Sequence, residues 1–297
     1  MVYGCGSVVL DALMLSNKGI HLNQKNSVKR QKIQIGGVIP SALMTLSRLG
    51  IKTSLIASVG NDLFGDAVVK LLKKEKVDLR YLLKTEDHPT PLAFVTLNEM
   101  TGERTSFYTT GVFSELREEE IKLHLDNKTK LLLIDGHNLN LSLNLARQAQ
   151  GVKAKVLLDL GSPKKGIEAL ISAADVVMVP RVYIERSGGG LKDEEVVKKF
   201  SSLKSKIVVL TMEEKGSLVI NGSEIFSQPA FKVKAVDTNG AGDIFFGSFA
   251  FGMLNNWDLR STTRFATGAA ALSCTKFGKE FPTIGEIEEF LNSANEV

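Results

Sequence analysis

One short segment of the chain has residue types and spacing that suit phosphoryl chemistry, the run from Asp237 to Asp243 with the sequence DTNGAGD. Three consecutive small residues within it, Gly240, Ala241 and Gly242, allow neighbouring backbone N–H groups to turn toward one point. An apolar run over residues 244–254 follows, which predicts a helix. Because the N-terminus of a helix carries positive partial charge, the segment is expected to form an anion cradle.

The carboxylate of Asp243 stands directly beside this cradle. A fixed negative charge there would repel a resting anion. It makes chemical sense as a base that takes a proton from a hydroxyl while the cradle holds a phosphoryl group in transfer. The alternative is a glycine-rich turn between a strand and a helix, with the aspartate as its N-terminal cap. The seven residues together favour the phosphate site.

Two further segments could contact a ligand. Asp11 follows the apolar run Val2 to Leu10, which we expect to be a buried strand. A carboxylate at that end of a strand can accept hydrogen bonds from adjacent hydroxyls of a polyol, and the alternative is a turn or helix-cap aspartate. Gly36 and Gly37 precede a predicted helix over residues 40–49. They fit either close approach of the backbone to a ligand or a plain turn.

A polar segment from Asp135 to Asn138 follows another apolar strand, at the edge where α/β enzymes bind ligands. It offers His137 and Asn138 as candidates, and the alternative is an ordinary polar loop. The 4 histidines of the chain have no i,i+4 pairing, which argues against a zinc site.

Two nucleotide-binding motifs are excluded. The glycine spacing of a phosphate-binding loop recurs from Gly161 to Gly166, but Ile167 and Glu168 stand where that loop needs a lysine and a hydroxyl. The pair Gly4 and Gly6 lacks the third glycine of a dinucleotide fingerprint, which argues against a nicotinamide enzyme.

Composition limits the class of protein. With 43% hydrophobic and 24% charged residues in 297, the chain has the composition of a soluble globular protein. The net charge of +4 suits anionic small ligands but is too diffuse to predict nucleic-acid binding. Cys5 and Cys274 have no metal-ligating neighbours, which predicts a reduced, intracellular protein. No signal-like start and no apolar stretch of ~18 residues is present, so we expect a cytoplasmic protein without membrane contact.

The order of the apolar runs predicts a single α/β domain over residues 1–297. Short apolar runs alternate with helical patterns in its second half, as in a parallel sheet with crossover helices: Leu131–Ile134, Val156–Leu158, Val176–Val179 and Ile207–Leu210. Two segments, near residues 12–35 and 88–112, have the alternation and turns of antiparallel strands. They are expected to pair into a small β-sheet lid.

Several motifs in this order resemble the pfkB, or ribokinase-like, carbohydrate kinases, and the resemblance covers nearly the whole chain. The run from Asp237 to Asp243 matches the second family signature, D-T-x-G-A-G-D, at every position. Three further segments are similar to family motifs: Gly36-Gly37 with the helix that closes at Arg48-Leu49-Gly50, the run from Ser58 to Gly65, and the lid turn Gly102-Glu103-Arg104-Thr105.

The resemblance implies a Rossmann-like core of mostly parallel sheet with a β lid, ATP and Mg²⁺ as cofactors, and a sugar or similar polyol as acceptor. It implies that Asp243 is the base and that the amides of Gly240, Ala241 and Gly242 stabilise charge on the transferred phosphoryl group. The remaining roles are substrate binding by Asp11, Gly36, Gly37, Ser41, Arg104 and Asn138, nucleotide binding by Thr211, Glu213, Gly216, Cys274 and Gly278, and a potassium site at Asp237 and Asn239.

The chain departs from the family pattern at three positions. Ser41 stands where members commonly have a sugar-binding asparagine, Glu213 replaces a glycine near the nucleotide, and Arg181 occupies the start of the N-x-x-E motif associated with magnesium. We therefore expect an ATP-dependent kinase whose acceptor is a monosaccharide such as a ketohexose. The alternatives are a nucleoside or inositol kinase, a kinase of a sugar phosphate, and a catalytically weak sugar- or nucleotide-binding relative. A homodimer through the lid is a further expectation.

Overall fold

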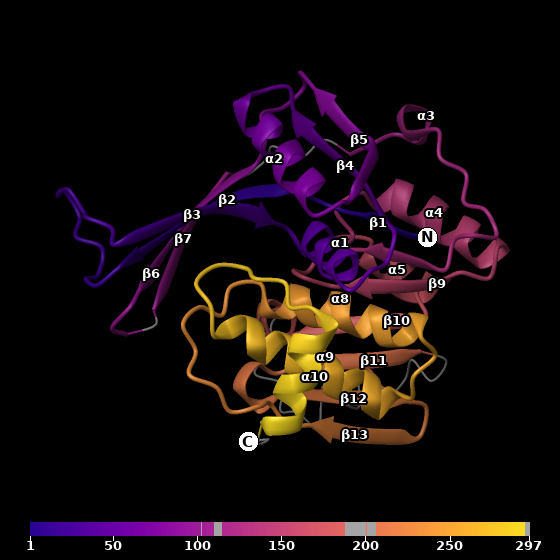
Figure 1. The fold of residues 1–297 in the computed structure, drawn as a ribbon. Coiled ribbons are helices and arrows are strands. Elements are labelled where there is room, and N and C mark those ends of the chain that lie inside the picture. Colours follow the sequence, from indigo (N-terminus) through magenta and orange to yellow (C-terminus); the bar gives the residue numbers. More distant parts are fainter. Residues whose placement is uncertain (102, 110–114, 188–199, 201–205, 295–297) are drawn as a thin grey trace.

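A nine-stranded sheet forms the centre of the molecule (Figure 1). The computed structural model describes residues 1–101, 103–109, 115–187, 200 and 206–294. The strand order is β13-β12-β11-β10-β9-β8-β1-β4-β5; β12 pairs antiparallel with both β11 and β13, and all other neighbouring pairs are parallel. Their bounds are β1 (Val2–Cys5), β4 (Thr53–Gly60), β5 (Asp78–Thr85), β8 (Leu131–Ile134), β9 (Lys155–Asp159), β10 (Val176–Pro180), β11 (Ile207–Thr211), β12 (Ser217–Asn221) and β13 (Glu224–Gln228).

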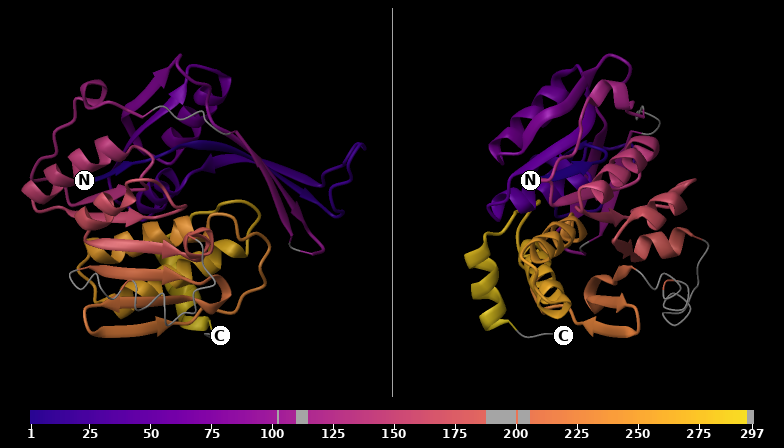
Figure 2. Two further views of the ribbon diagram at one scale, coloured as in Figure 1. Left: turned by 180° about the vertical axis from the view of Figure 1, so that it is seen from behind. Right: turned by 90° about the vertical axis from the view of Figure 1, so that its right-hand side faces the viewer.

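Helices cover both faces of this sheet, as the right-hand view of Figure 2 shows. One face packs against α1 (Val38–Arg48), α2 (Leu63–Lys74), α8 (Ala241–Leu254), α9 (Leu259–Cys274) and α10 (Ile284–Ser293). The other packs against α3 (Glu118–Ile121), α4 (Leu139–Gly151), α5 (Ile167–Ala173) and α6 (Arg181–Arg186). Because the parallel strands are buried on both faces, they appear in the sequence as continuous apolar runs. The expected α/β fold is confirmed.

A second, four-stranded sheet projects from the body as an arm (Figure 1). It has the order β3-β2-β6-β7, with β2 (Val9–Ser16), β3 (Arg30–Gly36), β6 (Leu92–Asn98) and β7 (Arg104–Tyr108). The two segments expected near residues 12–35 and 88–112 supply these strands, and residues 102 and 110–112 lie outside the described ranges. We call this sheet the lid.

The prediction of one buried strand over residues 2–10 is wrong. In the structure β1 ends at Cys5, and β2 starts at Val9 in the other sheet. The chain crosses from body to lid through Gly6, where an added Cβ would meet Asp135 and Ile39. Asp11 is consequently a lid residue that faces the body, rather than a residue at the end of a body strand.

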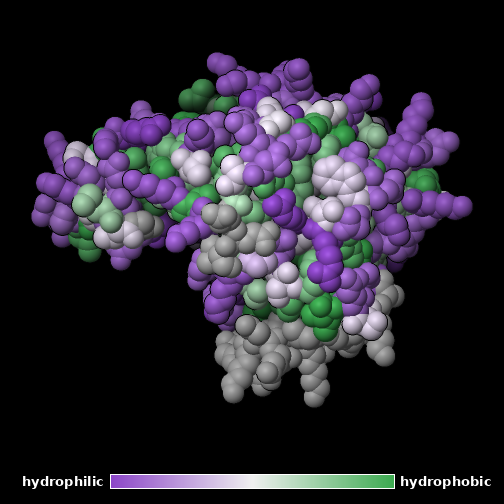
Figure 3. Space-filling view, turned by 60° about the horizontal axis from the view of Figure 1, so that its bottom comes forward, coloured by the Kyte–Doolittle hydropathy of each residue, from purple (hydrophilic) through white to green (hydrophobic). Residues whose placement is uncertain are grey.

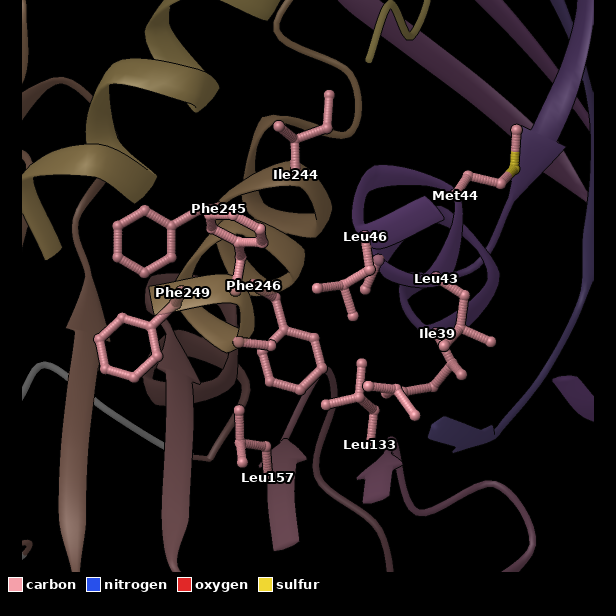
Figure 4. Packing of buried hydrophobic residues seen from close by; sticks show 14 of the residues in the cluster. Ile39, Leu43, Met44, Leu46, Leu133, Leu157, Ile244, Phe245, Phe246 and Phe249 are labelled. Carbon is pink, nitrogen blue, oxygen red and sulfur yellow. The ribbon is translucent and has the colours of Figure 1, made fainter. Parts of the chain in front are cut away.

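Helix α8 is apolar around its circumference because it is buried between α1, α9 and the sheet. Figure 4 shows the side chain of Phe246 pointing toward Ile39 of α1 and Leu133 of β8. Within the described residues, no helix is both long and apolar enough to cross a membrane. Since α1 carries Ser41 and α8 carries Asp243, the contact between these two helices sets the distance between the two predicted site residues.

Gly247 is the point of closest approach between α1 and α8. A Cβ placed there would lie 2.7 Å from the carbonyl oxygen of Ala42 and 2.8 Å from Cβ of Thr45. The backbone oxygen cannot move without α1, so the absence of a side chain at 247 is what allows the helices to pack this closely.

We expect Gly247→Ala to lower the free energy of unfolding by about 1–3 kcal/mol, because the extra methyl group forces α1 and α8 apart. Urea unfolding measures the change. Gly285→Ala in α10 is the matched control, since nothing lies within 4 Å of its added Cβ. Equal effects of the two substitutions would contradict the close-packing argument.

Candidate active site

The predicted anion cradle forms the N-terminal end of α8. Gly240 is the residue before the helix and has φ of 82°, in the left-handed region that favours glycine. Ala241 and Gly242 start the helix, so their N–H groups belong to its free N-terminal turn. Asp243 lies in the same turn, but its side chain makes no cap hydrogen bond. The alternative interpretation of Asp243 as an N-terminal cap is therefore wrong.

Asp237 holds the segment before the cradle in place. Its Oδ1 accepts a hydrogen bond from the backbone N–H of Asn239, at 2.9 Å, and its Oδ2 accepts one from the N–H of Gly278, also at 2.9 Å. The carboxylate is buried. It therefore ties the cradle to the loop that follows α9.

The predicted acceptor-binding residues of the lid and α1 meet on one side of the cradle. Asp11 of β2 is paired with Gln34 of β3, and its carboxylate occupies the space that a Cβ at Gly36 would need. Gly37 has φ of 92° and starts α1. Ser41, one turn later, donates a hydrogen bond to the carbonyl oxygen of Gly37 at 2.7 Å. The absence of a side chain at Gly36 thus leaves room for the carboxylate of Asp11, and Gly37 adopts the positive φ that the turn into α1 requires.

Lys279 joins these groups to Asp243, and it is not among the residues predicted from the sequence. Its ammonium donates to Oδ2 of Asp243 at 2.9 Å, to Oγ of Ser41 at 3.0 Å and to the carbonyl oxygen of Ile35 at 3.1 Å. Oδ2 of Asp11 is 4.0 Å away. The side chain of Lys279 is only 3% exposed. One signal was available in the sequence, because this lysine directly follows Gly278, which was assigned to the site.

Burial and charge set the protonation of this cluster. Burial raises the pKa of the Asp11 carboxyl, and Asp243 adds to this while Lys279 opposes it. Burial alone would lower the pKa of Lys279, but the carboxylates of Asp243 and Asp11 outweigh burial and hold it above its usual value. Lys279 is therefore a buried ammonium that stays charged because two aspartates surround it.

A third carboxyl, that of Asp159, lies buried at the end of β9. Burial raises its pKa to about 7, and the charge of Asp243 contributes next. Its Oδ1 accepts a hydrogen bond from the N–H of Gly161 at 2.8 Å. This residue was not predicted from the sequence either, because it forms the last position of an apolar strand.

A cavity of about 740 Å³ opens on the other side of the cradle, where Ala241 and Gly242 line it. This volume is typical of small-molecule sites. Four of the five predicted nucleotide-binding residues line it, namely Thr211, Glu213, Gly216 and Cys274. Three cationic side chains, Arg104, Arg181 and Lys232, lie along the same wall as Phe231 and Phe245. Positive charge beside apolar surface fits a nucleotide polyphosphate and its base.

The other predicted site residues lie elsewhere. Gly278 packs behind the cradle against Lys32 and Gln34 of the lid. Arg104 reaches from β7 to Oδ1 of Asn239, at 3.3 Å, and so faces the nucleotide cavity rather than Asp11.

Asn138 accepts a hydrogen bond from the N–H of Leu116 at 3.0 Å. The structure does not bring it to the group formed by Asp11, Gly36, Gly37 and Ser41, which we call the acceptor cluster. Over the described ranges, no group of three or more His, Cys, Asp or Glu side chains is arranged to hold a metal ion.

The comparisons with known proteins agree on one family. The model of the pfkB family carbohydrate kinases matches residues 5–284. A predicted sugar kinase of Pyrococcus horikoshii is 28% identical over an alignment of 306 positions, which covers 94% of this chain and 91% of the relative. A ribokinase of Lactococcus lactis is 25% identical over 95% of this chain and 94% of its own. The solved ribokinase of Thermotoga maritima superimposes with a TM-score of 0.83 at 26% identity, over 98% of this chain and 99% of that one.

Asp159 predicts a pH dependence of stability. Its folded pKa of about 7 lies above the ordinary value of 3.8, so the folded state favours the neutral carboxyl and loses stability as the pH rises from 4 to 7. Asparagine keeps the oxygen that accepts from Gly161 but never ionises. In thermal unfolding, Asp159→Asn should therefore gain roughly 2–3 kcal/mol more stability at pH 8 than at pH 5. An equal gain at both pH values would contradict the assigned burial of the charge.

Proposed function

The chain belongs to the pfkB family of carbohydrate kinases, and from that premise we propose that it transfers the γ-phosphoryl group of ATP to a hydroxyl of a small neutral monosaccharide, with a ketohexose favoured. The observation that carries the proposal is the place of Asp243. Its carboxylate lies in the first turn of α8, next to Ala241 and Gly242 of the nucleotide cavity, and it is joined through Lys279 to Ser41. A base between a nucleotide cavity and a polar acceptor cluster is what phosphoryl transfer needs.

Each part of this arrangement has a separate task. Asp243 takes the proton of the acceptor hydroxyl. The free N–H groups at the start of α8 face the charge that develops on the phosphoryl oxygens, and the helix end adds its positive potential. Arg104, Arg181 and Lys232 attract the polyphosphate. A magnesium ion bound with the nucleotide supplies further charge neutralisation.

The proposal assigns no step to a potassium ion. Each carboxylate oxygen of Asp237 already accepts a backbone hydrogen bond, from Asn239 and from Gly278. The two residues predicted to bind potassium, Asp237 and Asn239, therefore fit a structural role in the cradle better than a ligand role.

The charges around the acceptor cluster favour a neutral acceptor over a sugar phosphate. Lys32, the nearest lid lysine, donates to Oε1 of Glu280 at 2.6 Å and to two backbone oxygens. Arg104 is directed toward Asn239. Asp11, Asp243 and Lys279 together carry a net negative charge when ionised, which repels an anionic acceptor. A nucleoside or inositol is the alternative acceptor, since both offer neutral hydroxyls.

A catalytically weak sugar- or nucleotide-binding protein is the second candidate, based on the departures at Ser41, Glu213 and Arg181. The complete cradle argues against this candidate, because the side chain of Asp243 makes no capping hydrogen bond. We therefore favour an active kinase.

We further propose that two copies of the chain associate through the lid. Ile33, Phe94 and Phe107 are 52%, 46% and 58% exposed, and the register of the strands places them in one row with Ala12 across the sheet. They lie on the face opposite Leu13 and Val95, which pack on Phe277. Figure 3 shows the lid as an arm with hydrophobic side chains among hydrophilic ones. An apolar row on an extended sheet supports burial against a second copy.

Phosphorylation of an acceptor panel tests the function. We expect the purified protein to phosphorylate at least one of fructose, ribose, a nucleoside or inositol with ATP and Mg²⁺, and fructose 1-phosphate poorly. Asp243→Asn should lower kcat by about 10²–10⁴-fold, because the base is lost. Calorimetry with a non-hydrolysable ATP analogue should show unchanged nucleotide binding. Full activity of Asp243→Asn would disprove the assigned base, and absence of nucleotide binding by the parent would favour the catalytically weak sugar-binding relative.

Replacing Glu213 is expected to change the affinity of the protein for ATP. It has φ of 55°, a conformation that favours glycine, and it lines the nucleotide cavity. Because the carboxylate repels a polyphosphate, Glu213→Gln should lower the KM for ATP by about two- to fivefold. Glu213→Gly should do the same and also raise thermal stability, since it relieves the backbone. An unchanged or higher KM in both variants would show that Glu213 points away from the nucleotide or assists its metal.

A further inference from the structure

Lys279 is the residue at which the cradle, the base and the lid meet. Its aliphatic stem lies where a Cβ at Gly240 would stand, so it packs directly under the cradle. Its backbone is held from the lid, because its N–H donates to Oε1 of Gln34 at 2.9 Å and its carbonyl oxygen accepts from Nζ of Lys32 at 3.2 Å. Both partners come from β3. The side chain is thus fixed at its base by the lid and along its stem by the cradle.

The ammonium of Lys279 has no donor left for a ligand. It has three N–H bonds, and the three acceptors are Oδ2 of Asp243, Oγ of Ser41 and the carbonyl oxygen of Ile35. With 3% of its side chain exposed, the ammonium is also shielded from solvent. Direct contact with the acceptor is therefore not the function that the geometry supports.

The contact between Lys279 and Asp243 does have a consequence for the reaction. It engages Oδ2, while no hydrogen bond to Oδ1 is found within the described part of the chain. The Asp243 side chain remains 18% exposed. Oδ1 is therefore the atom available to receive the proton of the acceptor hydroxyl, and the rotation of the carboxylate is fixed by the ion pair.

The hydroxyl of Ser41 supports this arrangement. It donates its proton to the carbonyl oxygen of Gly37 and accepts a hydrogen bond from Lys279. Through that ammonium the hydroxyl is connected to Asp243.

We propose that Lys279 is a positioning residue for the catalytic base, held in place by Ser41 and by the lid strand β3, and that it holds the carboxylate of Asp243 rotated toward the acceptor. This inference rests on the proposed kinase function for its kinetic consequences. The charged groups that face the pair are Asp11 from β2, Asp237 from the loop before α8 and Asp159 from β9. All three are acidic, so Lys279 supplies the opposing positive charge.

The kinetic test compares Lys279→Met with Lys276→Met, an exposed lysine three residues earlier in the same segment. We expect Lys279→Met to lower kcat by about 10- to 100-fold with the KM for ATP unchanged, because the base is misplaced rather than the nucleotide site. Lys276→Met should match the parent. Identical kcat values in both variants, or a loss in Lys279→Met that appears in the KM for ATP rather than in kcat, would overturn the proposal.

Ser41→Ala is a milder variant, and it tests whether Ser41 acts on Asp243 through Lys279. We expect it to lower kcat by a smaller factor than Lys279→Met does, and to have no further effect on kcat in the Lys279→Met background. Additive losses of kcat in the double variant would show that Ser41 acts independently of Lys279, which contradicts its assigned role.

A thermal-unfolding cycle without any substrate separates this inference from the proposed function. Lys279→Met leaves two acidic side chains unpaired in a buried site and should lower Tm. Adding Asp243→Asn removes one of those charges, so the double variant should unfold at a higher temperature than Lys279→Met alone. A double variant whose Tm falls by the sum of the two single effects would refute the pairing. If the parent phosphorylated no acceptor, the proposed function would fail while this cycle still decided the ion pair.

Discussion

The accumulation of negative charge at one edge of the sheet is the constraint on which the rest of the structure depends. Asp11, Asp159 and Asp243 come from three different elements and converge in a largely buried site. Burying several carboxylates in a medium of low dielectric is costly unless opposite charge accompanies them. Two solutions are visible. The pKa of Asp159 rises to about 7, and Lys279 brings a permanent positive charge to Asp243 and Asp11. Such a buried pair contributes little net stability, so its value lies in fixing the geometry of the Asp243 carboxylate.

The same lysine links parts of the fold that are far apart in the sequence. Gln34 and Lys32 of the lid hold its backbone, and Gly278 beside it donates to Asp237 at the start of the cradle segment. On the other lid hairpin, Arg104 reaches Asn239. One hairpin therefore touches the segment from Asp237 to Asp243 directly, and the other is joined to it through Lys279.

The sequence was most informative where chemistry depends on adjacent residues. The cradle, the parallel sheet and the lid strands follow from local patterns, since small residues before a helix and short apolar runs are compatible with few local structures. The sequence was least informative where a contact joins distant residues. Lys279 is separated by 36 residues from Asp243 and by 238 from Ser41, and no local pattern marks a lysine that will be buried. The sequence suggests the wrong strand for Asp11 because Val2 to Leu10 is mostly apolar, although a crossing between two sheets interrupts it.

The most direct test of this account is the state of the Lys279 ammonium in the free protein. Lysine labelled with ¹⁵N gives a side-chain signal that Lys279→Met assigns by its loss. The account predicts an ammonium that is protected from exchange with water, stays protonated beyond the ordinary lysine value of 10.5 and shifts when Asp243→Asn is introduced. An ammonium that exchanges freely, loses its proton below that value or is indifferent to Asp243→Asn would contradict the pairing on which the site is built.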